Sequence, residues 1–315
     1  MLFLTEADVR KLLPMREAVR LMGETFAALK SHASQNQPRR RMHLASGSVL
    51  HAMAGAHGKY FGTKIYATNA RHGSMSFLFW LLDAETAKPL ALMEANWLGQ
   101  IRTGAASGYA ADLLARPDAQ TLGIIGSGFQ ARGQVEAVSA VRKLREVRVW
   151  SRDAANRKRF AIECSNDFGL TVRAVETARE AVENCDIVAT ATWSQTPVLD
   201  AEWISPGTHI NAMGSNNSTR RELPTSLIAR ADVIACDSIE QAKIESGDLL
   251  LAWSEEEWKT PRLVELQDAQ RNDAQQITIF KSNGLGVEDV AAGAFVYEEA
   301  LRTGAGRPLY SGAES

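Results

Sequence analysis

The stretch LGIIGSGFQARGQVEAV, residues 122–138, decides the fold. Its apolar start is typical of a buried strand, and its end has the apolar spacing of a helix. Between them GSGFQA, residues 126–131, fits the pattern GxGxxA. In that pattern the first glycine allows a tight turn, the second lets the backbone approach a pyrophosphate, and the small third residue packs helix on strand. We therefore predict a dinucleotide-binding turn formed by Gly126, Ser127, Gly128, Phe129, Gln130 and Ala131.

From Ala119 onward, short apolar runs alternate with amphipathic stretches. The runs are TLGIIG, EVRVWS, LTVRAV, DIVATAT, HINAMG, DVIACD and ITIFKS. Strands buried on both faces have this composition, and their alternation with helices indicates parallel βαβ units. The sequence predicts an α/β Rossmann domain over residues 116–286.

The preceding residues are organised differently. Thr5 can cap a helix that begins near Glu6, and a second helix is predicted after Pro14. After the polar link SHASQNQ, the runs SVLHAM, YFGTKIYAT, SFLFWLLDA and PLALMEA predict an antiparallel sheet. The helix predicted in VEDVAAGAFVYEEALRTG can pack back on this part. We expect residues 1–115 and 287–315 to form an α+β domain into which the Rossmann domain is inserted.

The overall composition argues against several partners. The chain has 315 residues, 35 basic and 37 acidic, so its net charge of −2 creates no field that attracts nucleic acid or a membrane surface. The three cysteines are widely spaced and the histidines lack ligand spacing, which disfavours disulfides and metal sites. The first ten residues include acidic side chains and make a poor signal peptide. We expect a cytoplasmic protein with no metal and no nucleic-acid or membrane partner.

The type of dinucleotide depends on the end of the second Rossmann strand. NAD-specific domains usually carry an acidic residue there for the ribose 2′-hydroxyl, whereas this chain has Ser151 and Arg152. A hydroxyl and a guanidinium suit a 2′-phosphate, so NADP(H) is favoured. NAD(H) stays open because Asp153 follows directly. Further cofactor contacts are predicted where strands end at the carboxyl edge of the sheet, at Gly214, Ser215, Ser282 and Gly284.

Several motifs together resemble a known family. IRTGAASGYAADLLA, LGIIGSGFQAR, GSNNSTRREL and FKSNGLGVEDVAAGAFVYEEA are similar, in this order, to the ornithine cyclodeaminase/mu-crystallin family. The resemblance implies a Rossmann domain inserted into a substrate and dimerisation domain, a homodimer, and hydride chemistry at the α-carbon of an amino or imino acid.

The resemblance also assigns substrate residues. Arg40, Lys64 and Arg102 fall on the family's basic substrate-contacting positions. Two guanidiniums and an ammonium can hold a carboxylate rigidly and so orient its α-carbon. The neighbouring Arg39 and Arg41 are expected to lie in solvent.

Two positions depart from the cyclodeaminase pattern. Asn216 stands where the family's cyclodeaminases have an aspartate, and an amide cannot act as a general base. His51 replaces the glutamate expected ahead of Lys64. We predict that Asn216 hydrogen-bonds the substrate or nicotinamide. His51 either supplies a proton to an imine or is a neutral, partly buried strand histidine.

These features favour an NADP(H)-dependent imino-acid reductase or amino-acid dehydrogenase, acting on a compound such as Δ1-pyrroline-2-carboxylate. One alternative is ornithine cyclodeaminase, which converts ornithine to proline and ammonia with NAD. The other is a mu-crystallin-like protein that binds NADPH without turnover. The retained basic residues favour an enzyme over such a binding protein.

Overall fold

The computed structural model describes residues 1–69 and 71–309, and the chain divides into two compact units. The first unit is Met1–Arg102 with Leu285–Ser315, and the second is Thr103–Gly284. The sequence placed these boundaries after residues 115 and 286. The first differs because helix α3 (Asn96–Leu114) contributes residues to both units. Its later part belongs to the second unit, where Asn211 Nδ2 donates a hydrogen bond to the Ser107 carbonyl.

The first unit contains a mixed sheet in the strand order β15-β1-β6-β5-β4-β3-β2. The predicted antiparallel arrangement from β3 to β6 is confirmed, and β1 adds in parallel to β6. Strand β2 occupies part of the stretch expected to be a link, because its polar residues and Pro38 hide the alternation of a strand. The strands are β1 (Leu2–Leu4), β2 (Ser34–His43), β3 (Ser48–His57), β4 (Tyr60–Asn69), β5 (Ser74–Asp83), β6 (Pro89–Glu94) and β15 (Arg307–Pro308).

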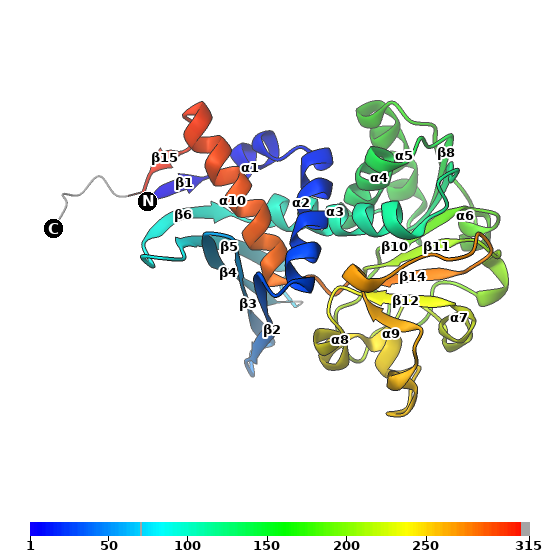
Figure 1. Cartoon of the computed structure of the whole chain (residues 1–315). Coiled ribbons are helices and arrows are strands. Elements are labelled where there is room, and N and C mark those ends of the chain that lie inside the picture. Colours follow the sequence, from blue (N-terminus) through cyan, green and yellow to red (C-terminus); the bar gives the residue numbers. More distant parts are fainter. Residues whose placement is uncertain (70, 310–315) are drawn as a thin grey trace. The chain divides into compact units, whose positions relative to one another are not determined.

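Helices α1 (Glu6–Leu12), α2 (Met15–Lys30) and α10 (Gly286–Thr303) belong to the same unit. Thr5 caps α1 in a reciprocal capping box, as its sequence predicts. Helix α10 packs on β3 and β4 (Figure 1). A Cβ on Gly55 would lie 2.5 Å from the backbone nitrogen of Val287, so the missing side chain permits this close approach.

The second unit confirms the predicted parallel sheet. Its strand order is β13-β12-β14-β11-β10-β7-β8-β9, and every described pair is parallel. Strand β13 was not predicted. The strands are β7 (Thr121–Ile125), β8 (Glu146–Trp150), β9 (Val172–Ala174), β10 (Ile187–Thr190), β11 (His209–Ala212), β12 (Val233–Cys236), β13 (Leu263–Glu265) and β14 (Thr278–Lys281).

Helices cover both faces of this sheet, so neighbouring strand residues enter different cores. Ile124 packs in the cluster that includes Ala131, whereas Ile125 packs in the cluster that includes Leu227. Burial on both faces of the sheet explains why the sequences of these strands contain continuous apolar runs. The helices are α4 (Phe129–Val141), α5 (Ala154–Phe168), α6 (Ala178–Val182), α7 (Thr225–Arg230), α8 (Ile239–Glu245) and α9 (Gly247–Leu250), with short 3-10 turns at Ala201–Trp203, Glu257–Lys259 and Leu266–Asp268.

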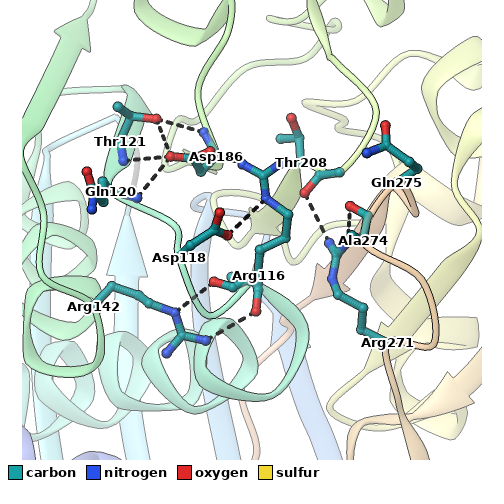
Figure 2. Close-up of polar contacts among 12 residues, drawn as sticks. Arg116, Asp118, Gln120, Thr121, Arg142, Asp186, Thr208, Arg271, Ala274 and Gln275 are labelled. Carbon is teal, nitrogen blue, oxygen red and sulfur yellow. Dashed lines mark hydrogen bonds and ion pairs between the residues drawn. The ribbon is translucent and has the colours of Figure 1, made fainter.

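Arginines hold the end of α3 and the residues after it at the amino edge of the parallel sheet. Figure 2 shows Arg116, Arg142 and Arg271 with the polar groups around them. Arg142 Nε donates to the Arg116 carbonyl at 3.1 Å, and Arg271 Nε donates to the Leu114 carbonyl at 2.5 Å. Arg116 in turn pairs with Asp186, whose Oδ2 accepts from the Thr121 hydroxyl at 2.7 Å. The last turn of α3 is thereby held at the edge opposite the glycine turn.

The described residues contain no helix long and apolar enough to cross a membrane. Within the same ranges, no group of three or more His, Cys, Asp or Glu side chains could hold a metal ion. The three cysteines are free and buried, and burial raises the thiol pKa of both Cys164 and Cys185 to about 12.

Candidate functional site

A buried charged cluster lies in the first unit, where β4, α3 and α10 supply Lys64, Arg102 and Asp289. Lys64 Nζ donates to Asp289 Oδ1 at 2.7 Å, and Arg102 Nε donates to the same oxygen at 3.0 Å. Arg102 Nη1 also donates to Glu288 Oε2 at 2.7 Å. Lys64 is only 2% exposed. The acidic pair at the start of α10, which sequence reasoning missed, therefore holds two of the predicted substrate residues.

The environment of Lys64 makes its ammonium an unusually good acid. Burial lowers the Lys64 pKa most, the nearby Arg102 charge lowers it further, and Asp289 opposes both, so that it falls to about 7. Burial also acts on Arg102, but Asp289 and Glu288 outweigh it and raise the Arg102 pKa. Near neutral pH Lys64 can therefore exchange a proton, while Arg102 keeps its charge.

The burial of Arg39 and the exposure of Arg40, both on β2, differ from what the sequence predicts. Arg39 is 5% exposed and Arg40 is exposed, so the expectation that Arg39 lies in solvent is wrong. Arg40 pairs with Ala52, whereas Lys64 pairs with Met53. Neighbouring strand residues point to opposite faces, so Arg39, and not Arg40, lies on the face that carries Lys64. The Arg39 charge accordingly contributes to the lowered Lys64 pKa.

His51 lies opposite Tyr66 in the pairing of β3 with β4. Its ring stacks on Tyr66 with a centroid distance of 4.1 Å, and its Nε2 lies 3.1 Å from the Thr68 hydroxyl. Burial, followed by the charges of Arg41 and Arg39, lowers the His51 pKa to about 4. The imidazole is therefore neutral at pH 7, as in the second of the two roles considered above.

The glycine turn follows β7 in the second unit and opens helix α4. Gly126 has φ +116°, and a Cβ there would lie 2.5 Å from the Ala191 carbonyl oxygen. Gly128 is the N-cap of α4, and a Cβ there would meet no atom within 4 Å. This open space at a helix N-terminus fits the phosphates of a dinucleotide. Phe129, Gln130 and Ala131 form the first turn of α4.

The end of β8 carries the residues predicted to select the cofactor. Ser151 Oγ accepts a hydrogen bond of 2.8 Å from the Ser127 hydroxyl, which joins it to the glycine turn. Arg152 is exposed. Asp153 caps α5 by accepting from the Asn156 backbone N–H at 2.9 Å. This bond gives Asp153 a structural role as a helix cap, which does not depend on contact with a ribose.

Gly214 and Ser215 follow β11, and buried charges hold them in place. Gly214 N donates to Glu222 Oε2 at 2.8 Å, and the Ser215 carbonyl accepts from Lys281 Nζ at 2.6 Å. Lys281 also pairs with Asp248 at 3.1 Å. This network was not among the predicted features, although a lysine at the end of the apolar run ITIFKS is a signal for a paired buried charge.

Ser282 and Gly284 follow β14 and are held by Asp237. The Gly284 backbone N–H donates to Asp237 Oδ2 at 2.5 Å, and the Ser282 hydroxyl donates to it at 3.4 Å. Asn216 is exposed in the loop after β11. Trp193 is 71% exposed beside Arg220. The cofactor and catalytic roles assigned to these predicted residues stay predictions.

Comparison with known proteins places these features in a family. A model described as "Ornithine cyclodeaminase/mu-crystallin family" matches residues 1–304. A Delta(1)-pyrroline-2-carboxylate reductase of Bacillus cereus is 39% identical over 236 residues, which cover 73% of this chain and 72% of the reductase.

Two solved structures resemble the whole fold. The Delta(1)-pyrroline-2-carboxylate reductase of Thermococcus litoralis, in complex with NADH and L-proline, has a TM-score of 0.93 and 33% identity, covering 98% of this chain and 100% of that one. An archaeal alanine dehydrogenase dimer with bound NAD has a TM-score of 0.89 and 31% identity, covering 99% of both chains. The chain belongs to the ornithine cyclodeaminase/mu-crystallin family, as its motifs predict.

Proposed function

We propose that the protein reduces the C=N bond of a small α-imino acid, of the Δ1-pyrroline-2-carboxylate type, to the corresponding α-amino acid. It is an NAD(P)-dependent oxidoreductase. The bound reduced nicotinamide supplies a hydride to the imine carbon and leaves oxidised. The observation that carries the proposal is the buried Lys64, with a pKa of about 7, on a sheet face shared with Arg39 and next to Arg102.

The charges of the cluster suit one carboxylate. Lys64 and Arg102 are buried beside Asp289, and the charge of the buried Arg39 acts on Lys64 as well. Buried cations gathered in this way can bind a substrate carboxylate through charge-assisted hydrogen bonds. In this proposal Arg39 replaces Arg40 as the second guanidinium, because Arg40 lies on the opposite face from Lys64.

Lys64 supplies the proton that imine reduction requires. Protonation of the imine nitrogen makes its carbon a better hydride acceptor, and a general acid acts best when its pKa lies near the working pH. The Lys64 pKa of about 7 meets this condition, whereas the His51 pKa of about 4 leaves that imidazole without a proton to give. His51 then supports the site through its contacts with Tyr66 and Thr68.

NADP(H) is the favoured cofactor. The exposed Arg152 beside Ser151 can bind a 2′-phosphate, while Asp153 is engaged as the cap of α5. Gly126 and Gly128 would hold the pyrophosphate. The two solved relatives hold NADH and NAD, so the preference for NADP(H) rests on the residues of this chain.

The protein also has a surface suited to a second copy of itself. One face of the β2–β5 sheet exposes five large apolar side chains, opposite the face that carries Lys64. Contiguous exposed apolar surface of this kind marks interaction sites. We propose a homodimer joined through this face, in line with the dimeric alanine dehydrogenase. The side chains are Met42, Leu50, Ile65, Leu78 and Trp80.

The test is an absorbance assay with three parallel reactions: Δ1-pyrroline-2-carboxylate with NADPH, the same imine with NADH, and ornithine with NAD. Oxidation of NADPH with formation of proline supports imine reduction. Proline and ammonia from ornithine alone would instead identify a cyclodeaminase, against the argument from Asn216. Tight NADPH binding without turnover on any imino acid would identify a binding protein.

A further inference from the structure

The two carboxylate oxygens of Asp289 have different surroundings. Oδ1 accepts hydrogen bonds from Lys64 Nζ at 2.7 Å and Arg102 Nε at 3.0 Å. Oδ2 is buried and has no hydrogen-bond partner among the described residues, although Asp289 is fully removed from solvent. A buried acceptor without a donor is destabilising, and more so when it is charged. Oδ2 is therefore suited to a donor that a ligand brings.

The chemistry of the donor follows from the neighbours of Oδ2. Lys64 and Arg102 are two of the groups proposed to bind the substrate carboxylate, and both contact the same aspartate. In an α-imino or α-amino acid the nitrogen is attached to the carbon next to the carboxylate carbon. When its carboxylate binds these cations, an α-amino acid, or an α-imino acid whose nitrogen is protonated, thus carries an N–H within reach of an acceptor that adjoins them.

We propose that Asp289 Oδ2 accepts a hydrogen bond from the protonated substrate nitrogen, that of an iminium or an ammonium, and thereby selects α-imino and α-amino acids over their oxygen analogues. The inference rests on the proposed function and deepens it. An ether or carbonyl oxygen at the same position turns a lone pair toward the carboxylate and leaves Oδ2 without a donor. Sites built to hydrogen-bond a substrate N–H reject analogues that lack it far better than apolar pockets reject a missing methylene.

The first test compares two ligands with the wild-type protein and its oxidised cofactor. L-proline and tetrahydrofuran-2-carboxylate share ring size and carboxylate but differ in N–H against O. Because hydrogen bonds to charged groups contribute about 1.5–3 kcal/mol, calorimetry should find proline bound about 10- to 150-fold more tightly. Equal affinities would overturn the proposal without the need for any variant.

The variant Asp289→Asn should reverse the preference. An amide has a single acceptor oxygen, and the donors on Lys64 and Arg102 will retain it. The amide NH₂ then takes the place of Oδ2 and presents a donor, which suits the ring oxygen and repels the substrate nitrogen. The ratio of the two dissociation constants should therefore shift toward tetrahydrofuran-2-carboxylate by at least about tenfold.

Glu288→Gln is the matched control. It removes one charge from the neighbouring residue, which hydrogen-bonds Arg102 Nη1, and should change the affinity for both ligands alike while keeping their ratio. An unchanged ratio in Asp289→Asn would show that Asp289 only positions Lys64. Cofactor binding reports whether each variant is folded, and if Asp289→Asn does not fold, the wild-type comparison alone decides.

The inference and the proposed function can fail separately. Imine reduction by a wild-type protein that binds both ligands equally would remove Asp289 as a selector and keep the reaction. Tight, nitrogen-dependent proline binding without any imine reduction would keep the selector and refute the reaction.

Discussion

Lys64 Nζ lies 2.7 Å from Asp289 Oδ1, and neither side chain has appreciable contact with solvent. Strand β4 supplies the lysine and helix α10 the aspartate, from distant parts of the sequence. The carboxylate raises the Lys64 pKa, against burial and the neighbouring arginines that lower it. The balance keeps the ammonium near the midpoint of its titration at neutral pH.

This balance predicts a pH profile. Lys64 must be protonated to act as an acid, so kcat for imine reduction should be highest below the Lys64 pKa and fall as the pH rises through about 7. Asp289→Asn removes the charge that favours the ammonium, so the falling limb should move to lower pH. The measurement is kcat against pH at saturating imine. If kcat falls at the same pH in both proteins, Lys64 is not the group that transfers the proton.

Arg39 and Arg40 provide a matched pair of variants. Arg39→Ala should raise KM for the imine about 10- to 100-fold, because a buried charge-assisted contact to the carboxylate is lost. Arg40→Ala removes an exposed arginine from the opposite face and should change KM less than twofold. Steady-state kinetics with both variants decides between them. A large effect at Arg40 alone would restore the original assignment from the sequence.

Arg152→Asp tests cofactor selection. Replacing the guanidinium with a carboxylate should repel a 2′-phosphate and accept a ribose hydroxyl, so the kcat/KM ratio of NADPH to NADH should fall at least about tenfold. Asp153→Asn serves as the control, since it alters the cap of α5 next to Arg152 and should leave the ratio unchanged. If Arg152→Asp keeps the wild-type ratio, Arg152 has no part in selection.

The outer face of the β2–β5 sheet predicts the oligomeric state. Ile65 and Leu78 are exposed and directly opposite each other on β4 and β5. Ile65→Glu should place a charge within the proposed interface and give a monomer in sedimentation velocity. Ile162→Glu, at an exposed position on α5 in the other unit, should leave the sedimentation coefficient unchanged. A wild-type monomer, or an Ile65→Glu dimer, would refute this interface.

The second unit could be predicted from the sequence because its signals are local. The glycine turn, the strand before it and the helix after it lie within residues 121–141, and the apolar runs mark most of the parallel strands. Strand β13 is only three residues long and carried no such signal.

The buried cluster could be predicted only in part. Lys64 and Arg102 were identified, but Asp289 and Glu288 meet them through contacts of long sequence separation that no local pattern reveals. The assignment of Arg40 depended on β2, a polar strand with Pro38 and a register shift between Gln37 and Arg40. Because β2 was not predicted, the alternation of its side chains could not be used to place Arg39 on the buried face.

The central claim is tested most directly by NADPH oxidation with Δ1-pyrroline-2-carboxylate, measured for the wild type and for Lys64→Ala. The account predicts that the wild type forms one proline for each NADPH consumed. Lys64→Ala should be at least about 100-fold slower, because it lacks the general acid, while NADPH binding stays unchanged. A wild type that leaves NADPH unoxidised, or a Lys64→Ala variant of equal rate, would contradict the account.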